Sequence, residues 1–399
     1  MQLRYNYRVY PTPGQRQALV RAFGCARVVF NDALAVRLSA FEQQLPYPKD
    51  EELSKQLITD AKKTEERAWL GEVSAVVLQQ ALADLNTAYR NFFSSISGKR
   101  KGPKVSRPRF RSRRDNRQAI RFTKNARFKV LEDGSLRLPR IGDVAVRWSR
   151  DLPSEPSSVT IVKDASGRYF ASFVVQTGDD ETLPQVDTEV GIDLGLTSFA
   201  VSSDGKVIAS PKYFRQAERR LKKAQRALSR KQKGSRNREK ARLEVARAHA
   251  RVADRRRDFH HKLSTRIIRE NQAVYAEDLS VNGLARTRLA KSIHDSGWSS
   301  FTAMLEYKAQ RHGRTFVKIG RWFPSTRLCS GCGAAGAKKP LHVRKWICPC
   351  GAVHDRDINA AKNILAAGRA ERLNACGADG RLRSTEAVSS EAGTRRGAA

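Results

Sequence analysis

The spacing of apolar positions changes along the chain, and residues 2–97 show two patterns. Residues 2–12, QLRYNYRVYPT, alternate between polar and apolar positions, which predicts a strand that ends at the prolines. From residue 14 to residue 97, apolar residues recur every three or four positions, which predicts a helical segment. The positions with this spacing are Leu19, Phe23, Ala26, Phe30, Leu34, Leu38 and Phe41, then Leu78, Leu82, Leu85 and Tyr89. We expect most of these side chains in a hydrophobic core.

The next segment returns to a strand pattern. SSVTIVKD and RYFASFVVQT are rich in β-branched and aromatic residues and flank the turn ASG, which predicts a hairpin. The polar stretch DDETLPQ that follows is typical of a linker into a new domain. We therefore expect a strand-rich region before about residue 182 and a second domain after it.

The second half predicts strands and helices in a definite order. TEVGIDLG, TSFAVSS and KVIAS are three short strands, the last two joined by the turn DG, as in an antiparallel meander. Two basic helices follow around KGS at residues 233–235, and strands QAVYAEDLS and TFVKIGR flank a helix near residues 298–312. A final helix begins after residue 356. This order is similar to that of the RNase H fold.

The net charge of the chain indicates which class of partner it binds. The 399 residues include 76 Lys and Arg against 40 Asp and Glu, a formal charge of +36. A chain with this charge attracts polyanions, so nucleic acid is the expected partner and a membrane surface the weaker alternative. The sequence contains no apolar run long enough to span a bilayer and no signal peptide at its start, so we expect a cytoplasmic protein.

Two segments concentrate the basic residues. Residues 99–129 combine many Lys and Arg with Phe110, Phe122 and Phe128, a mixture that binds phosphates and stacks bases, although a disordered basic linker has a similar composition. Residues 212–257 predict a basic helical hairpin that is either a nucleic-acid track or a solvated face. The candidate nucleic-acid-binding residues are Arg107, Arg109, Arg111, Arg113, Arg114, Arg219, Lys222, Lys223 and Arg226.

Three carboxylates occupy the places where RNase H-like enzymes hold metal. Asp193 lies in an apolar strand between Gly191 and Gly195, Glu277 lies in a later strand, and Asp357 begins the last helix. Buried carboxylates need cations, and oxygen ligands suit Mg²⁺ or Mn²⁺. Two such ions can activate water and stabilise the leaving oxygen in phosphodiester hydrolysis.

Simpler readings remain open for each acid. Glu277 or its neighbour Asp278 could end a strand, and Asp355 or Asp357 could cap the last helix. Adjacent strand residues face opposite ways, so only one of the first pair can point at Asp193. GIDLG also resembles the first phosphate-binding turn of actin-like ATPases and sugar kinases, but the second glycine-rich motif that those enzymes need is missing.

Four cysteines predict a structural zinc site. Cys329 and Cys332 form one pair, and Cys348 and Cys350 form another after an intervening loop. The second pair is separated by one residue instead of the usual two, so His342 or His354 could replace one thiolate. The zinc-binding segment lies just before Asp357, where it would fix the start of the last helix.

These motifs together resemble the TnpB family, RNA-guided nucleases that insertion sequences encode and that are related to type V CRISPR effectors. The matching stretches run in family order over nearly the whole chain: YRVYPTPGQRQALV, GCARVVFNDAL, GIDLGLTSFAV, AEDLSVNGL, PSTRLCSGCG and CPCGAVHDRDINAAKNIL. The resemblance implies that Asp193, Glu277 and Asp357 are the catalytic residues.

The resemblance also implies a multidomain α+β fold. Its parts would be a β-barrel wedge domain (residues 1–13 and 98–182), a helical recognition domain (14–97), a RuvC-like nuclease domain of RNase H-like α/β fold (183–323 and 353–376) and a zinc-ribbon insert (324–352). The tail, residues 377–399, is small and polar without periodicity, which predicts disorder.

The function that the resemblance implies is cleavage of double-stranded DNA next to a short target-adjacent motif, directed by a guide RNA from the transposon end. Base pairing would then select the target, while the protein holds the heteroduplex by its shape and charge. We expect a monomer associated with a prokaryotic nucleoid. The alternatives are an RNA- or DNA-binding regulator or transposition accessory factor that does not cut, and an enzyme that joins DNA ends.

Overall fold

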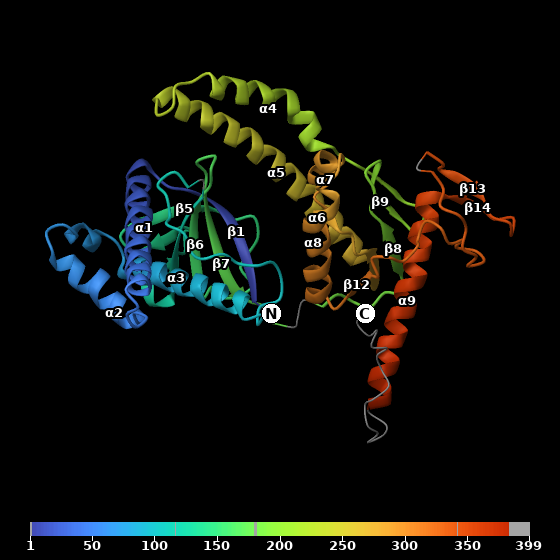
Figure 1. Cartoon of the computed structure of the whole chain (residues 1–399), viewed down its shortest axis with the longest axis horizontal. Helices are drawn as coiled ribbons and strands as arrows, with labels where there is room; N and C mark the ends of the chain where they lie inside the picture. The colour runs from blue at the N-terminus through green and yellow to red at the C-terminus, as the bar shows by residue number, and fades with distance from the viewer. Residues whose placement is uncertain (1, 116, 179–181, 341, 383–399) are drawn as a thin grey trace. The chain divides into compact units, whose positions relative to one another are not determined.

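The computed structural model describes residues 2–115, 117–178, 182–340 and 342–382, and it divides the chain into two compact units. The N-terminal unit is Met1–Gly178 and the C-terminal unit is Asp179–Ala399 (Figure 1). This division lies close to the expected boundary between residues 182 and 183. The segments expected as the wedge and recognition domains both fall within the N-terminal unit.

A seven-stranded antiparallel sheet forms the centre of the N-terminal unit, in the order β2-β6-β7-β1-β5-β4-β3. Its strands are β1 (Gln2–Tyr10), β2 (Gln118–Thr123), β3 (Lys129–Val130), β4 (Leu136–Leu138), β5 (Gly142–Arg147), β6 (Ser158–Lys163) and β7 (Tyr169–Gln176). The predicted opening strand and the predicted hairpin are confirmed as β1 and as β6 with β7.

The connection between β2 and β3 requires this sheet to curl. These strands lie at opposite ends of the sheet order, about 29 Å apart in a flat sheet of this width. Yet β2 ends at Thr123 and β3 begins at Lys129, a link that spans at most about 22 Å. The expected barrel is a curled sheet, and in the described residues no pairing joins β2 to β3. β3 has just two residues, which leaves little edge to pair.

Helices cover this sheet and share its core. They are α1 (Pro13–Glu42), α2 (Asp50–Ser54), the π-helix η1 (Lys55–Asp60), the 3₁₀ turns η2 (Ala61–Lys63), η3 (Ala68–Glu72) and η4 (Lys124–Ala126), and α3 (Ala75–Ile96). Thr12 and Gln15 form a capping box at the start of α1. Most of the periodic positions are buried with the sheet's side chains, but Phe41 is exposed near the end of α1, where the Arg107 guanidinium lies over its ring.

The C-terminal unit contains a five-stranded mixed sheet in the order β10-β9-β8-β11-β12. Its strands are β8 (Glu189–Asp193), β9 (Ser198–Ser202), β10 (Val207–Ala209), β11 (Ala273–Glu277) and β12 (Thr315–Ile319). The predicted antiparallel meander is confirmed as β8, β9 and β10. β11 lies parallel to both β8 and β12, which brings the carboxyl ends of these three strands to one edge.

The helices of this unit match the predicted order. They are α4 (Tyr213–Ser229), α5 (Arg236–Glu270), α6 (Val281–Leu284), α7 (Ala290–Ser296), α8 (Trp298–Arg311) and α9 (Arg356–Leu382), and the short strands β13 (Lys345–Ile347) and β14 (Val353–Asp355) precede α9. α4 and α5 lie side by side as a long hairpin, held by a seam of Leu221, Ala248 and Val252 (Figure 1).

The last helix is longer than expected. α9 continues to Leu382, so the structure describes residues 377–382, the first part of the tail expected to be disordered, as helix. The reason is that NILAAGRAERLNA is rich in Ala, Leu, Arg and Glu, which favour helix and carry it past the glycines that follow. The remainder of the expected tail, residues 383–399, lies outside the described residues.

Gly191 allows α9 to pack directly on the sheet. A Cβ atom at this position of β8 would lie 2.1 Å from the Ala361 carbonyl oxygen and 2.6 Å from the Leu365 nitrogen, both in the backbone of α9. Such contacts are far inside van der Waals distance, so any side chain here would push the helix away. Gly191 therefore permits the close approach of the two backbones.

We therefore predict that Gly191→Ala destabilises the C-terminal unit by about 1–3 kcal/mol or more, because the helix backbone cannot yield as a flexible side chain would. Thermal or denaturant unfolding of the purified protein measures the change. Gly320→Ala is the matched control, since a Cβ there meets no atom within 4 Å. Equal stability of the two variants would contradict the packing account.

Candidate active site and metal centre

The register of two parallel strands places Asp193 and Glu277 side by side. Ile192 of β8 is the partner of Ala276 of β11, so the next residue of each strand, Asp193 and Glu277, lies at the same level. Neighbouring strands are about 4.8 Å apart, and level residues point to the same face. Asp278 is the next residue along the chain, and its carboxylate accepts a hydrogen bond from Arg321 at 2.5 Å. Glu277 is thus the acid that accompanies Asp193.

The start of α9 supplies the third carboxylate. Asp355 accepts hydrogen bonds from the backbone N–H groups of Asp357 at 3.0 Å and Ile358 at 3.1 Å, so Asp355 caps the helix. This leaves the Asp357 side chain in the first turn free of the capping role. Because α9 packs against β8, its first turn lies near the edge that holds Asp193.

The three acids affect one another electrostatically. Burial, together with the negative charges of Glu277 and Asp357, raises the pKa of Asp193 to about 7, against the opposing effect of Arg344 and Arg356. Without a cation, the Asp193 carboxyl group would therefore be partly protonated near neutral pH. A divalent cation would relieve both the repulsion and the burial cost, which is the chemistry of a metal-binding acid cluster.

Arg344 and Ser325 hold two of these acids in place by hydrogen bonds, and the sequence analysis did not indicate either residue. The Arg344 Nη1 donates to both carboxylate oxygens of Asp357, at 2.9 and 3.0 Å, and its Nη2 donates to the Thr197 hydroxyl at 3.0 Å. The Ser325 hydroxyl donates to Glu277. Among the described residues, the four cysteines form a group whose ligand atoms all lie within 4.8 Å of one another, and the three acids do not form such a group. Arg344 is one of many basic residues, and no local pattern marks it.

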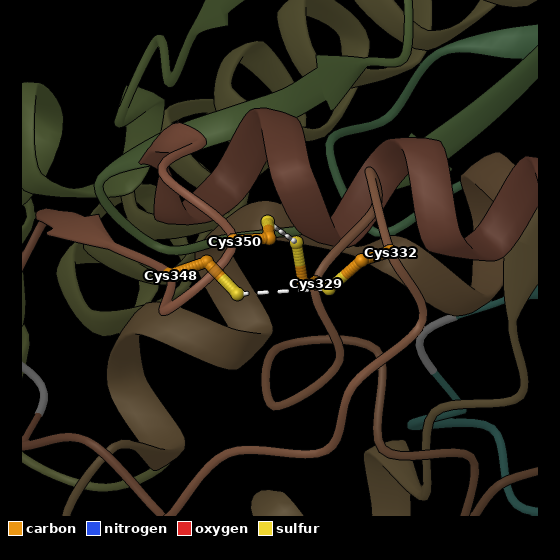
Figure 2. Close-up of side chains that lie close together, drawn as sticks. All are labelled: Cys329, Cys332, Cys348 and Cys350. Atoms are coloured by element: carbon orange, nitrogen blue, oxygen red, sulfur yellow. Dashed lines mark hydrogen bonds between the residues drawn. The ribbon is translucent and has the colours of Figure 1, made fainter.

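The four cysteines converge on one point (Figure 2). Their sulfur atoms all lie within 4.8 Å of one another, with Cys329 to Cys350 at 3.8 Å and Cys332 to Cys348 at 3.7 Å. In a tetrahedral site with Zn–S bonds of about 2.3 Å, neighbouring sulfurs are about 3.8 Å apart. The observed spacing is therefore that of a zinc-binding thiolate set.

The geometry of His354 differs from that of a fourth ligand. Its Nε2 lies 3.0 Å from the Cys329 sulfur, whereas a nitrogen and a sulfur on one tetrahedral zinc are about 3.5 Å apart. The contact is a hydrogen bond instead. Backbone N–H groups of Cys332 and Gly331, together with His354, lower the pKa of Cys329 to about 5, which favours the thiolate that binds metal. The other candidate, His342, is exposed and lies outside this sulfur cluster.

The short second cysteine pair forms the same kind of turn as the first. In the first turn, Gly333 has a φ of +75° and donates to the Cys329 carbonyl at 2.9 Å. In the second, Gly351 has a φ of +86° and donates to the Cys348 carbonyl at 2.9 Å. A glycine takes the left-handed conformation in both, and the second turn is one residue shorter. The departure from the usual spacing thus leaves the sulfurs in place.

Two buried asparagines of α9 fix the cysteine segment beside the acids. Asn359 donates to the Leu328 carbonyl at 2.7 Å and accepts from the Ser330 N–H at 2.9 Å. Asn363 donates to the carbonyls of Ser325 and Leu328 at 2.7 and 2.8 Å. The residues before the first cysteine pair are therefore tied to the helix that begins at Asp357. Sequence reasoning did not single out either asparagine.

The candidate basic residues of α4 lie on one open face. Arg219, Lys222, Lys223 and Arg226 line a groove of 820 Å³ together with Arg215 and Arg230. Within it, Lys222 forms an ion pair with Glu218 at 2.9 Å. This face points away from the seam with α5 and can accept an extended polyanion.

The basic segment after α3 is partly structural. Arg111 pairs with Asp84 at 3.2 Å, and its guanidinium lies 3.7 Å from the centre of the Phe30 ring. Arg107 lies over the rings of Phe41 and Phe92. The other candidates of this segment, Arg109, Arg113 and Arg114, are exposed.

The aromatic residues of this segment differ in their burial. Phe122 is fully buried in the core, so the expectation that it stacks on bases is wrong: it occupies an inward position of β2. Phe128 packs against the same core, while Phe110 is 56% exposed. The interleaving of aromatic and basic residues is partly the alternation of a strand, which composition alone cannot distinguish from a base-stacking surface.

No helix in the part of the chain that the structure describes is long and apolar enough to cross a membrane.

Family models match three parts of the chain. Residues 172–288 match the OrfB_IS605 model, described as "Probable transposase", and residues 298–364 match the model of the Cas12f1-like TNB domain. Residues 1–45 match a model described as a helix-turn-helix domain, although in the structure they comprise β1, the single long helix α1 and the first residues after it.

Whole proteins are similar over nearly the full length. Two that bear the name "Putative RNA-guided DNA endonuclease" come from Streptomyces pristinaespiralis (47% identical, covering 94% of this chain and 90% of that protein) and Escherichia coli K12, where it is InsQ (31% identical, covering 91% of each). A solved structure titled "Cryo-EM structure of the Cas12f1-sgRNA-target DNA complex" has a similar fold, with a TM-score of 0.52 at 13% identity over 88% of this chain and 82% of that one.

Proposed function

The chain belongs to the TnpB family of RNA-guided DNA endonucleases, and we propose that it cuts DNA with divalent cations held by Asp193, Glu277 and Asp357. The observation that supports this most is that three acids, from two parallel strands and the first turn of α9, lie near enough to affect one another electrostatically, so that burial and the other two charges raise the pKa of Asp193. Acids gathered at this cost in a nuclease are candidate metal ligands.

The proposed chemistry is hydrolysis of a phosphodiester bond. Magnesium or manganese bound by the three acids would supply an activated water and stabilise the leaving oxygen. Ser325 orients Glu277 by hydrogen bonding. One arm of the Arg344 guanidinium, Nη1, orients Asp357, while the other arm, Nη2, donates to Thr197. Arg344 also places a positive charge beside the acids, where a phosphate group would lie.

We assign finer domain roles on the same basis. The C-terminal unit would be a RuvC-like nuclease domain of RNase H-like fold, since its meander and parallel strands follow that order of elements. Residues 324–352 would be its zinc-ribbon insert, with Cys329, Cys332, Cys348 and Cys350 as zinc ligands. The curled sheet and the helices of the N-terminal unit would be the wedge and recognition regions.

RNA and DNA are the partners of this family, and we propose their forms here. The guide RNA would derive from the transposon end, and the target would be double-stranded DNA beside a short adjacent motif. The formal charge of +36 suits a protein that holds an RNA–DNA heteroduplex by its backbone. We propose a monomer that acts at the prokaryotic nucleoid.

Incubation of the purified protein–RNA complex with plasmids tests this function. A plasmid that matches the guide should be linearised with magnesium and left intact with a chelator or with a mismatched guide. Joined DNA ends would indicate strand transfer instead. A shift in gel mobility without any cut, at all metal concentrations, would indicate a binding regulator.

The basic face of α4 gives a separate prediction. Replacing Arg219, Lys222, Lys223 and Arg226 with Gln should weaken nucleic-acid binding and flatten its salt dependence, by up to about one unit of log–log slope for each lost phosphate contact. Affinity measured across a salt series shows the slope. The matched control exchanges Lys and Arg at these four positions and keeps the charge. A slope that is the same for all three proteins would make this face a solvated surface.

A further inference from the structure

A six-residue turn after β12 is tied at two points to the residues that end β11. Ile319, the last residue of β12, is the register partner of Glu277. Beyond it, Arg321 donates to the Asp278 carbonyl at 3.2 Å and to its carboxylate at 2.5 Å, and the Ser325 hydroxyl donates to Glu277. The turn, residues 320–325, therefore lies against the edge of the sheet that holds the candidate active site.

Trp322 projects from the middle of this turn into solvent. Its side chain is 90% exposed, while the next residue, Phe323, packs against the core of Tyr275 and Ile319. The backbone around Trp322 is closed by hydrogen bonds from Phe323 to the Gly320 carbonyl at 3.0 Å and from Ser325 to the Phe323 carbonyl at 2.9 Å. An indole ring held out on an anchored turn, with no partner in the described residues, is a preformed contact surface.

We propose that Trp322 is the platform on which an unpaired base of the DNA strand being cut stacks while its phosphodiester is bound by the three acids. The inference rests on the proposed function and adds a positioning residue for the substrate. Trp322 is three residues from Ser325, so their Cα atoms are at most about 11 Å apart. Since a stacked strand rises about 3.4 Å along its axis for each nucleotide, the base would lie within about three nucleotides of the scissile bond.

The chemistry of an indole suits this substrate. Every base has a flat π-face, so stacking binds a strand without reading its sequence. Such a contact suits an enzyme whose target is selected by base pairing with RNA, because its cutting site has to accept any base. An RNA base or another protein surface could also cover an indole, but neither needs a position beside Glu277. The tie between the turn and that acid favours the strand that is cut.

A cleavage experiment with guide-loaded protein tests the proposal. Trp322→Ala should slow single-turnover cutting of a matched target about tenfold. Trp322→Phe should retain most of the rate and Trp322→Leu should not, because a ring and not merely an apolar side chain is required. Affinity for the target and for the guide should stay the same in all three. Val207→Ala is the control, an exposed apolar residue at the opposite edge of the same sheet.

Abasic sites identify the partner of the ring. An abasic nucleotide at the contacted position should slow the parent about as much as Trp322→Ala does, and should slow that variant no further. Parental rates in Trp322→Ala would overturn the proposal. Weaker guide binding by that variant would assign the ring to RNA, and a change in the oligomeric state would assign it to a protein contact; either result would also overturn it.

A binding measurement separates this proposal from the proposed function. A fluorescent adenine analogue, whose emission is quenched on stacking, is placed at the contacted position of the target and bound to the guide-loaded Asp193→Ala variant, which we expect not to cut. Quenching should occur with Trp322 present and disappear in the double variant with Trp322→Ala. Absent quenching at each of the three nucleotides on either side of the scissile bond would overturn the platform, whether or not the parent protein cuts.

Discussion

Replacing Asp193 with Ala is expected to reduce DNA cutting by about a thousandfold or more while guide-dependent target binding stays intact. Asp193 lies level with Glu277 at the ends of parallel strands, so its loss removes one anionic ligand from the centre of the proposed metal site. Phosphodiester chemistry needs the cations in fixed positions. Affinity comes instead from base pairing and from Lys and Arg side chains elsewhere, which the substitution does not change.

The same variant should fold at least as well as the parent. Burial and the charges of Glu277 and Asp357 raise the pKa of Asp193, so in metal-free protein its ionised form is disfavoured near neutral pH. Glu277→Ala and Asp357→Ala should lose cutting to a similar degree, and combining them should add little. Cutting and gel-shift binding are compared in one preparation of each, with Asp204→Ala in the β9–β10 turn as control. Substantial cutting by Asp193→Ala would remove it from the site, and loss of binding as well would make it a structural residue.

The second large effect is expected from the cysteines. Replacing both Cys329 and Cys332 with Ser should abolish zinc binding, unfold the insert and stop cutting. Zinc supplies about 10–16 kcal/mol of apparent binding free energy to small zinc-finger peptides, and that energy is also folding energy. Here the insert positions Arg344 on Asp357 and Ser325 on Glu277, so its loss would release two of the three acids. Metal analysis should find about one zinc in each parent chain.

Other substitutions distinguish the possible ligand sets. His354→Ala should retain zinc with reduced affinity, because His354 donates to a sulfur and does not ligate. Cys25→Ser, in α1 of the other unit, should leave the zinc content unchanged. Full zinc in the Cys329 and Cys332 double variant would refute the thiolate site. Complete loss of zinc in His354→Ala would establish a mixed site of cysteine and histidine.

The order of strands and helices is predictable because it depends on local patterns. A short stretch of sequence is enough to predict each of three elements: β1 from the alternation in residues 2–10, β10 from the DG turn before it, and α4 from the spacing that includes Leu221. Contacts between distant segments are not encoded in this way. The close packing of α9 on Gly191 and the pairing of Arg111 with Asp84 depend on the assembled fold.

Some residues of the candidate site can be identified from the sequence, and others only from the structure. Acidic residues in short motifs identify Asp193, Glu277 and Asp357 as candidates, and their motifs match those of a known family. Strand register then explains why Glu277 rather than Asp278 accompanies Asp193. Arg344 could not be selected from the sequence among so many basic residues, because its role depends on the position beside Asp357 that it takes in the folded protein. Trp322 is distinguished by the exposure of its side chain, which the sequence does not show.

Sulfur substitution at the scissile phosphate tests most directly whether the acids hold cations that act on DNA. Magnesium binds oxygen and binds sulfur poorly, whereas softer metals such as manganese tolerate sulfur better. The guide-loaded protein is given a target with one non-bridging oxygen of that phosphate replaced by sulfur, in each stereoisomer. At least one isomer should be cut slowly with magnesium and regain most of its rate with manganese. Equal rates in both metals for both isomers, relative to the oxygen target, would contradict cleavage by cations at Asp193, Glu277 and Asp357.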